Sequence, residues 1–228
     1  MVIITEYAHA RAGLIGNPSD GYFGKTIYFT FSDLKAYTET QRSSKIVIVP
    51  GNEDCTIFNN LTDLALDSEL YGYCGGIRLL RACIKRFDDY CSEKGVELRD
   101  ENFTIKYGTY IPRCVGLAGS SAIITACLRG LMKFYDIEIC EEDQAKIVWE
   151  TETKELKLAA GLQDRVVQVK QGLVYMDFTD EEMARNGYGK YEEMNPNLLP
   201  DMFIAFRTDF AGESTVPHTD LRTKFILY

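Results

Sequence analysis

The sequence is poor in the residues that several common catalytic sites need. Its 228 residues include only two histidines, His9 and His218, so a histidine-based metal site and a Ser/His/Asp triad have almost no material. The seven cysteines form no Cys-x-x-Cys pair, which excludes the usual zinc and thioredoxin-like motifs. We interpret them as reduced, mostly structural thiols, and expect any chemistry to rest on carboxylates, Lys and Arg side chains and backbone amides.

Basic residues and long apolar runs are also scarce. The chain has 25 Lys+Arg against 34 Asp+Glu and a formal net charge of −9, which disfavours binding to nucleic-acid phosphates. No apolar run approaches the roughly 18 residues of a membrane span, and residues 1–7 lack the basic and apolar regions of a signal peptide. We therefore expect a cytoplasmic protein without nucleic-acid or membrane partners, and the sequence leaves its oligomeric state open.

Hydrophobic periodicity predicts a mixture of strands and helices. β-rich runs bounded by turn residues indicate strands, and apolar residues at steps of three and four indicate amphipathic helices. The expected strands are 26–31, 45–49, 103–107, 172–178 and 202–206, and the expected helices are 76–91, 121–135 and 144–158. Because these do not alternate regularly, they favour an α+β fold. A stretch rich in Gly, Asn and Pro at 186–200 suggests two domains, residues 1–185 and 186–228.

A loop of small residues between an expected strand and an expected helix is the most informative segment. Residues 111–122 read Ile-Pro-Arg-Cys-Val-Gly-Leu-Ala-Gly-Ser-Ser-Ala. Small residues let the backbone approach an anion, and the N–H groups at a helix start favour phosphate. The alternative is an ordinary capped helix after a tight turn, and the segment by itself does not decide between the two.

A second polar loop lies near the N-terminus, at residues 11–25. Its Asn17 and Asp20 suit hydrogen bonding to the hydroxyl groups of a polyol, and its Arg11 suits bidentate binding of an anion. The alternative is a surface turn, because Asn-Pro-Ser-Asp-Gly is a common turn composition.

Carboxylates that could do chemistry occur between residues 152 and 164. Asp164 follows a small-residue turn and has Arg165 as its neighbour, so it is a candidate general base. Glu152 is a candidate ligand of a hard cation. The alternative for both is a solvent-exposed acidic surface.

These three segments, in this order, resemble motifs of the GHMP kinase superfamily. Residues 116–122 are similar to its phosphate loop, usually written G-L-G-S-S-A, and residues 11–20 occupy the position of its first motif. The resemblance is closest to the glucuronokinase branch, in several further blocks. These blocks are 14–27, 73–80, 111–113, 160–166 and 172–178.

The resemblance implies a fold and a set of roles. The fold is a GHMP kinase N-terminal domain of the ribosomal protein S5 domain 2-like type, followed by a truncated C-terminal α+β domain. The ATP phosphates would be bound by Gly116, Leu117, Gly119, Ser120 and Ser121, and Mg²⁺ by Ser121 and Glu152. Asp164 and Arg11 would be catalytic, and the sugar would contact Asn17, Asp20 and Arg165, with Arg165 and Arg11 as candidate partners of a substrate anion.

The implied activity is ATP-dependent phosphorylation of D-glucuronate at C1, with a sugar acid, ATP and Mg²⁺ as small-molecule partners. The superfamily's glycine-rich third motif is not present in the 228 residues, so we expect this form to be incomplete. A helix beginning at His218 or Asp220 would leave an unpaired apolar face and fray. Two alternatives remain: a non-catalytic nucleotide-binding protein of the same fold, and a galactokinase-like kinase of another sugar.

Overall fold

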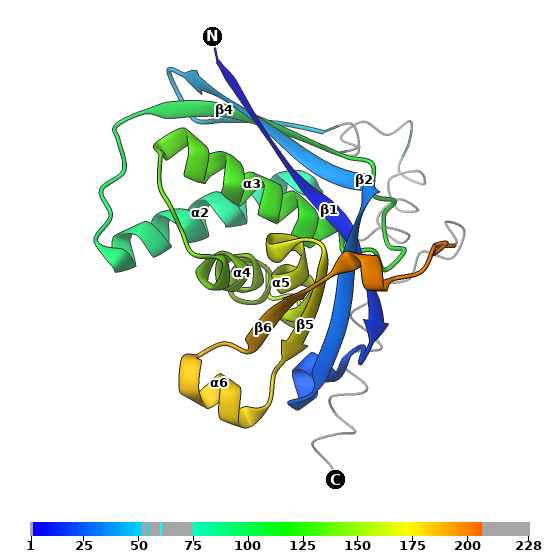
Figure 1. Cartoon of the computed structure of the whole chain (residues 1–228). Coiled ribbons are helices and arrows are strands. Elements are labelled where there is room, and N and C mark those ends of the chain that lie inside the picture. The colour runs from blue at the N-terminus through cyan, green and yellow to red at the C-terminus, as the bar shows by residue number, and fades with distance from the viewer. Residues whose placement is uncertain (1, 52–53, 55–59, 61–74, 207–228) are drawn as a thin grey trace.

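The computed structural model describes residues 2–51, 54, 60 and 75–206. Its helices gather on one face of a twisted six-stranded sheet (Figure 1). The strands are β1 (Ile3–Ile15), β2 (Lys25–Ser43), β3 (Val47–Val49), β4 (Asn102–Thr109), β5 (Leu173–Asp177) and β6 (Lys190–Met194). The helices are α2 (Gly76–Lys94), α3 (Gly119–Tyr135), α4 (Glu141–Glu150), α5 (Gln163–Lys170) and α6 (Asp180–Asn186). Shorter helical turns are Ser19–Tyr22, Thr151–Glu155 and Pro196–Leu198.

The long strand β2 organises the sheet. It pairs with β1 from Ile27 to Gln41, with β5 over its first residues and with β4 over its last, all antiparallel. The short β3 is parallel to β4, and β6 is antiparallel to β5. Because β2 spans both halves of the sheet, it joins the region of β4 to the region of β5.

The core lies between this sheet and helices α2 and α3. Side chains of α2 and α3 at helical spacing pack against inward-facing residues of β1, β2 and β4, since alternate residues of a strand face the same side. Fully buried members include Leu80, Phe87, Ile105, Ile124 and Leu128. A second cluster, formed mainly by residues of α5 and β5 together with Tyr28, fills the other half of the sheet.

The structure confirms most of the expected elements and the α+β class. Helix α2 extends three residues beyond the expected 76–91 and ends at Lys94, before Gly95, which adopts the left-handed conformation with φ 68°. The expected helix 144–158 is confirmed only in part, because α4 ends at Glu150 and a π-helical turn follows it. The expected strand 202–206 is wrong, since these residues have no regular secondary structure.

Strands β1 and β6 were not expected from the sequence. Strand β6 lies beyond the predicted domain boundary at residue 185 and pairs with β5, so it extends the same sheet. The division into domains 1–185 and 186–228 stays a prediction. The helix expected from His218 or Asp220 lies outside the described residues.

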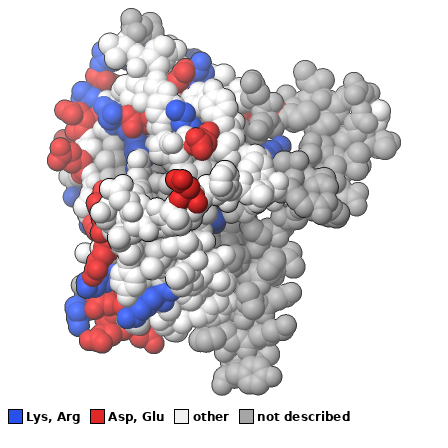
Figure 2. All heavy atoms as spheres, turned by 45° about the vertical axis from the view of Figure 1, so that its right-hand side comes forward, with Lys and Arg blue, Asp and Glu red and all other residues white. Residues whose placement is uncertain are grey.

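Charged side chains of both signs are mixed on the surface. Figure 2 shows Lys and Arg interspersed with Asp and Glu along one edge of the molecule, with largely uncharged surface beside them. None of the helices in the described ranges is both long and apolar enough to cross a membrane.

Candidate active site

A cleft of about 890 Å³ opens where three distant parts of the chain meet. Its walls come from the loop after β1, the loop before α3 and the segment before α5. All of the predicted site residues line the cleft except Glu152, which lies behind its wall. They are Arg11, Asn17, Asp20, Gly116, Leu117, Gly119, Ser120, Ser121, Asp164 and Arg165.

The loop before α3 presents the start of that helix to the cleft. Gly116 and Ala118 have φ values of 78° and 58°, so the backbone turns sharply before the helix begins. No side chain caps α3, and its first backbone hydrogen bond runs from Ala122 N to Ala118 O. The N–H groups of the first turn, together with the helix dipole, therefore provide a site suited to phosphate.

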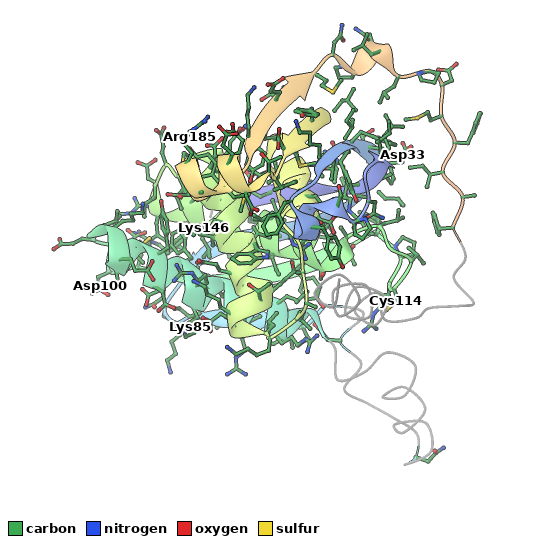
Figure 3. The ribbon with its side chains drawn as sticks, turned by 90° about the horizontal axis from the view of Figure 1, so that it is seen from below. Asp33, Lys85, Asp100, Cys114, Lys146 and Arg185 are labelled. Atoms are coloured by element: carbon green, nitrogen blue, oxygen red, sulfur yellow. The ribbon has the colours of Figure 1, made fainter. Side chains whose placement is uncertain are left out.

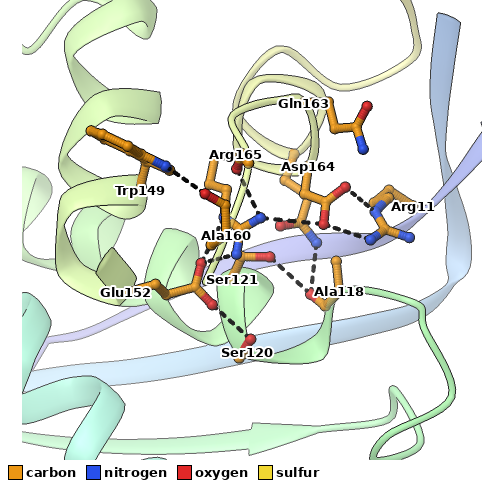
Figure 4. A network of polar contacts seen from close by, with 12 residues as sticks. Arg11, Ala118, Ser120, Ser121, Trp149, Glu152, Ala160, Gln163, Asp164 and Arg165 are labelled. Carbon is orange, nitrogen blue, oxygen red and sulfur yellow. Dashed lines mark hydrogen bonds and ion pairs between the residues drawn. The ribbon is translucent and has the colours of Figure 1, made fainter. Parts of the chain in front are cut away.

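Arg11 and Asp164 form a bidentate pair in the cleft (Figure 4). Arg11 Nε donates to Asp164 Oδ1 at 2.6 Å and Nη2 donates to Oδ2 at 2.5 Å. Its Nη1 donates to the carbonyl oxygen of Gly116 at 2.6 Å. Arg11 thus joins the carboxylate at the start of α5 to the loop that precedes α3.

Glu152, Arg165 and Ser120 form a second polar group behind the first. Glu152 is buried, accepts a hydrogen bond from Ser120 Oγ at 2.8 Å and is bonded by the guanidinium of Arg165 (Figure 4). Burial lowers the pKa of Arg165, but the charges of Glu152 and Asp164 outweigh it, so the pKa is raised and the guanidinium stays charged. Both guanidinium groups that the sequence offers for a substrate anion, those of Arg11 and Arg165, are therefore already bonded to carboxylates.

Ser120 and Ser121 have different surroundings. The hydroxyl of Ser121 donates to the carbonyl oxygen of Ala118 at 3.2 Å and is buried. Ser120 is exposed and faces Glu152. Of the two residues predicted as metal ligands, Glu152 thus lies beside Ser120 and not beside Ser121.

Ser120 and Glu152 bring together two oxygens of the kind that Mg²⁺ prefers. In this structure the Ser120 hydroxyl donates a hydrogen bond of ordinary length, 2.8 Å, to the Glu152 carboxylate. Within the described ranges there is no group of three or more His, Cys, Asp or Glu residues able to hold a metal ion. A cation at this place would need further oxygens from another molecule, as Mg²⁺ commonly takes from substrate phosphates.

Glu150 is the last residue of α4, and Glu152 lies in the π-helical turn Thr151–Glu155 that follows it. Both carboxylates are buried, with Glu150 bonded to Arg86 of α2 and Glu152 bonded to Arg165 of α5. Residues two apart in a helix point to nearly opposite sides, so this one segment can form ion pairs with both α2 and α5.

Gln163 joins the first loop to α5. Its backbone N–H donates to Asp20 Oδ2 at 3.1 Å, and its side-chain Nε2 donates to Asn17 Oδ1 at 3.0 Å. Burial raises the pKa of Asp20, and the nearby charge of Asp164 raises it further, against the lowering effect of the Gln163 hydrogen bond. The sequence reasoning missed Gln163, and its position directly before Asp164 is the only signal that marks it.

Comparisons with known proteins show which family this chain is similar to. Residues 78–172 match the family model described as GHMP kinases N terminal domain. The chain is 43% identical over 228 residues to probable glucuronokinase 2 of Arabidopsis thaliana, and 40% identical over 226 residues to glucuronokinase 1 of the same organism. Each alignment covers 98% of this chain and 62% of the relative, so the chain spans less than two thirds of these relatives' length.

Solved structures show the same fold at low sequence identity. A D-glycero-D-manno-heptose 1-phosphate kinase from Bacteroides thetaiotaomicron superposes with a TM-score of 0.64 at 19% identity. The superposition covers 85% of this chain and 60% of that one. The fold class expected from the motifs is therefore confirmed.

Proposed function

The chain carries a GHMP kinase N-terminal domain, and on this basis we propose that it belongs to an ATP-dependent kinase that phosphorylates D-glucuronate at C1. The printed names of the two plant relatives support this substrate. The observation that carries the proposal is the Arg11–Asp164 pair, which lines the same cleft as the uncapped start of α3. A base and an anion-binding helix end facing one space are what phosphoryl transfer between two bound molecules requires.

The phosphates of ATP bind at the start of α3 in this proposal. Backbone groups of Gly116, Leu117 and Gly119 approach them closely, and Ser120 and Ser121 supply further N–H groups. The small side chains leave the backbone accessible, and the helix dipole favours the negative charge.

Asp164 accepts the proton of the attacking sugar hydroxyl. Arg11 holds this carboxylate by two hydrogen bonds, which fixes its direction, and its positive charge offsets the negative charge that develops during transfer. Asn17 and Asp20 contact the sugar from the neighbouring wall. In phosphoryl transfer, most of the catalysis comes from positioning the reactants and compensating charge. The protein itself has little covalent chemistry to perform.

Mg²⁺ is part of this proposal, with Ser120 Oγ and Glu152 as its protein ligands. This assignment is supported over the pairing of Glu152 with Ser121 by two contacts: the Ser120 hydroxyl is bonded to Glu152, and the Ser121 hydroxyl is bonded to the carbonyl oxygen of Ala118. When bound, the ion would neutralise charge on the phosphate oxygens. A cytoplasmic location is also proposed, and the free thiols of the five described cysteines support a reducing compartment.

The test is coupled ADP release by the 228-residue protein with ATP, Mg²⁺ and either D-glucuronate or D-galactose. The variant Asp164→Asn removes the base, so turnover should fall about 10²–10⁴-fold while ATP affinity changes less than about twofold. The matched control is Asp100→Asn, an exposed residue that Figure 3 shows at the side of the molecule opposite Cys114, which lies two residues before the proposed phosphate loop. It should leave turnover unchanged.

Three results would contradict parts of the proposal. Faster turnover with D-galactose than with D-glucuronate would mean that the substrate is a neutral sugar and not a sugar acid. ATP binding without turnover on either sugar would favour a nucleotide-binding protein that is not catalytic in this form. Equal loss of turnover and ATP affinity in Asp164→Asn would contradict the role of that residue.

A further inference from the structure

Tyr28 lies beneath the Arg11–Asp164 pair without lining the cleft. It is on β2 opposite Gly13 of β1 in the sheet register, and its side chain is 1% exposed. A Cβ atom added at Gly13 would come within 2.8 Å of Tyr28 Cζ. The ring therefore lies directly against the backbone of β1, in space that any larger residue at position 13 would fill.

This position brings the ring under the guanidinium of Arg11. Arg11 is two residues before Gly13 on β1, so both lie on the same face of the strand. The guanidinium carbon is 5.6 Å from the centroid of the Tyr28 ring, within the range of a cation–π contact. The nitrogens at the edge of the guanidinium bind Asp164 and Gly116, while its carbon lies over the ring.

The hydroxyl group of Tyr28 acts on Gln163 and not on Arg11. Burial raises the pKa of Tyr28, and the charge of Asp164 raises it further, against the lowering effect of a hydrogen bond with the Gln163 side chain, so the phenol is neutral. This buried oxygen has no other hydrogen bond among the described residues. What Tyr28 offers its charged neighbour is the face of its ring.

We propose that Tyr28 is a positioning residue for the Arg11–Asp164 pair, and that Gly13 is required because it makes room for the Tyr28 ring. The expected effect on kcat rests on the kinase function proposed above, and the expected effect on the Arg11–Asp164 pair does not. Tyr28 holds the guanidinium from below, so that its two nitrogens remain in line with the carboxylate oxygens of Asp164. A displacement of about 1 Å at such a group can slow a reaction by about two orders of magnitude.

A simpler role for Tyr28 is to fill space in the second core cluster, beside residues such as Val166 and Met176. A leucine would retain an apolar side chain there but has no ring face. A phenylalanine keeps the ring and removes only the hydroxyl with its hydrogen bond to the Gln163 side chain. Tyr28→Leu and Tyr28→Phe therefore separate the two roles.

The experiment measures two properties of the 228-residue protein. The first is solvent exchange of the Arg11 Nε–H signal in ¹⁵N-labelled protein, assigned by its loss in Arg11→Lys. The second is kcat and KM for ATP in the coupled ADP assay. Tyr28→Leu and Gly13→Ala should each speed exchange of the Nε–H at least about tenfold and lower kcat roughly 10–100-fold, with KM for ATP within about twofold. Tyr28→Phe should match the wild type within about twofold in both properties.

The double variant Gly13→Ala/Tyr28→Leu tests the link between the two positions. Without the ring, an alanine at position 13 meets no obstacle, so the double variant should equal Tyr28→Leu alone and the effects should be non-additive. If Tyr28→Leu does not fold, the exchange rate of the Arg11 Nε–H in Gly13→Ala tests the proposal instead. Faster exchange than in the wild type supports the proposal, and an unchanged rate contradicts it.

Unchanged Arg11 exchange in folded Tyr28→Leu would overturn the proposal, as would an equal loss in Tyr28→Phe. Absence of sugar-dependent ADP release in the wild type would count against the proposed function, and the exchange measurement would still decide the role of Tyr28.

Discussion

At the scale of single residues, Gly161 leaves just enough room for the carboxylate of Asp20. A Cβ atom at Gly161 would lie 1.9 Å from Asp20 Oδ2. That oxygen accepts the hydrogen bond from the backbone N–H of Gln163, next to the proposed base. The absence of a side chain at position 161 therefore allows the loop that carries Asp20 and the start of α5 to meet.

Gly161→Ala should turn the Asp20 carboxylate away and break its hydrogen bond to Gln163. We expect KM for the sugar to rise roughly tenfold and the free energy of unfolding to fall by about 1 kcal/mol, the usual net value of one hydrogen bond. Steady-state kinetics and urea unfolding measure the two effects. Gly21→Ala is the matched control, since a Cβ atom there meets no atom within 4 Å, and equal effects in both variants would contradict this explanation.

The sequence singled out residues that the structure brings to one cleft, but it could not predict the contacts among them. The motifs single out Arg11 and Asp164, yet no local pattern places them together, because they are 153 positions apart. The choice of Ser120 over Ser121 as neighbour of Glu152 depends on the angle at which α3 meets the π-helical turn. Hydrophobic periodicity carries no information about such an angle.

At the scale of elements, a buried ion pair links α2 to α4. Arg86 Nε donates to Glu150 Oε2 at 2.7 Å, and both side chains are largely excluded from solvent. The π-helical turn that carries Glu152 begins directly after Glu150. This pair therefore anchors the segment that holds the proposed cation ligand.

Arg86→Met should lower the free energy of unfolding by about 3 kcal/mol, because the buried carboxylate of Glu150 keeps only Lys154, whose side chain is exposed, as a partner. The double variant Arg86→Met/Glu150→Met should recover most of this loss, since the charges that then lose a partner, those of Glu93 and Lys154, are exposed. Urea unfolding followed by circular dichroism measures both. Arg185→Met is the control: Arg185 is exposed and pairs with Glu181 on α6, and its loss should cost less than about 1 kcal/mol.

The elements with clear periodicity were predicted correctly, and those shaped by their neighbours were missed. Helix α2 has apolar residues at steps of three and four. Strand β1 has two irregularities in its pairing, at His9/Ala10 and Gly13/Ile15, which interrupt a simple alternation. The second half of β2 buries Thr38 and Thr40, polar residues that a hydrophobic pattern does not detect, and β6 is mostly charged.

At the scale of the whole molecule, the cleft is held by segments from both ends of the described chain. Ligand binding there should stabilise the complete fold and not one element. ATP with Mg²⁺ at about 100 times its dissociation constant should add about 2.7 kcal/mol to the free energy of unfolding, which corresponds to a Tm increase of about 5–10 °C for a chain of this size.

Thermal denaturation followed by fluorescence measures this increase. Adenosine at the same concentration is the control, since it lacks the phosphates that the start of α3 is proposed to bind. An equal increase with adenosine would place the main contribution to nucleotide affinity elsewhere in the cleft.

The 153 positions between Arg11 and Asp164 also have a consequence for biosynthesis. A ribosome that adds about 5–20 residues per second makes Asp164 about 8–30 s after Arg11. The proposed phosphate loop, at residues 116–122, is therefore made before Asp164. Phosphoryl transfer by the proposed Arg11–Asp164 pair has to wait until translation has passed Asp164.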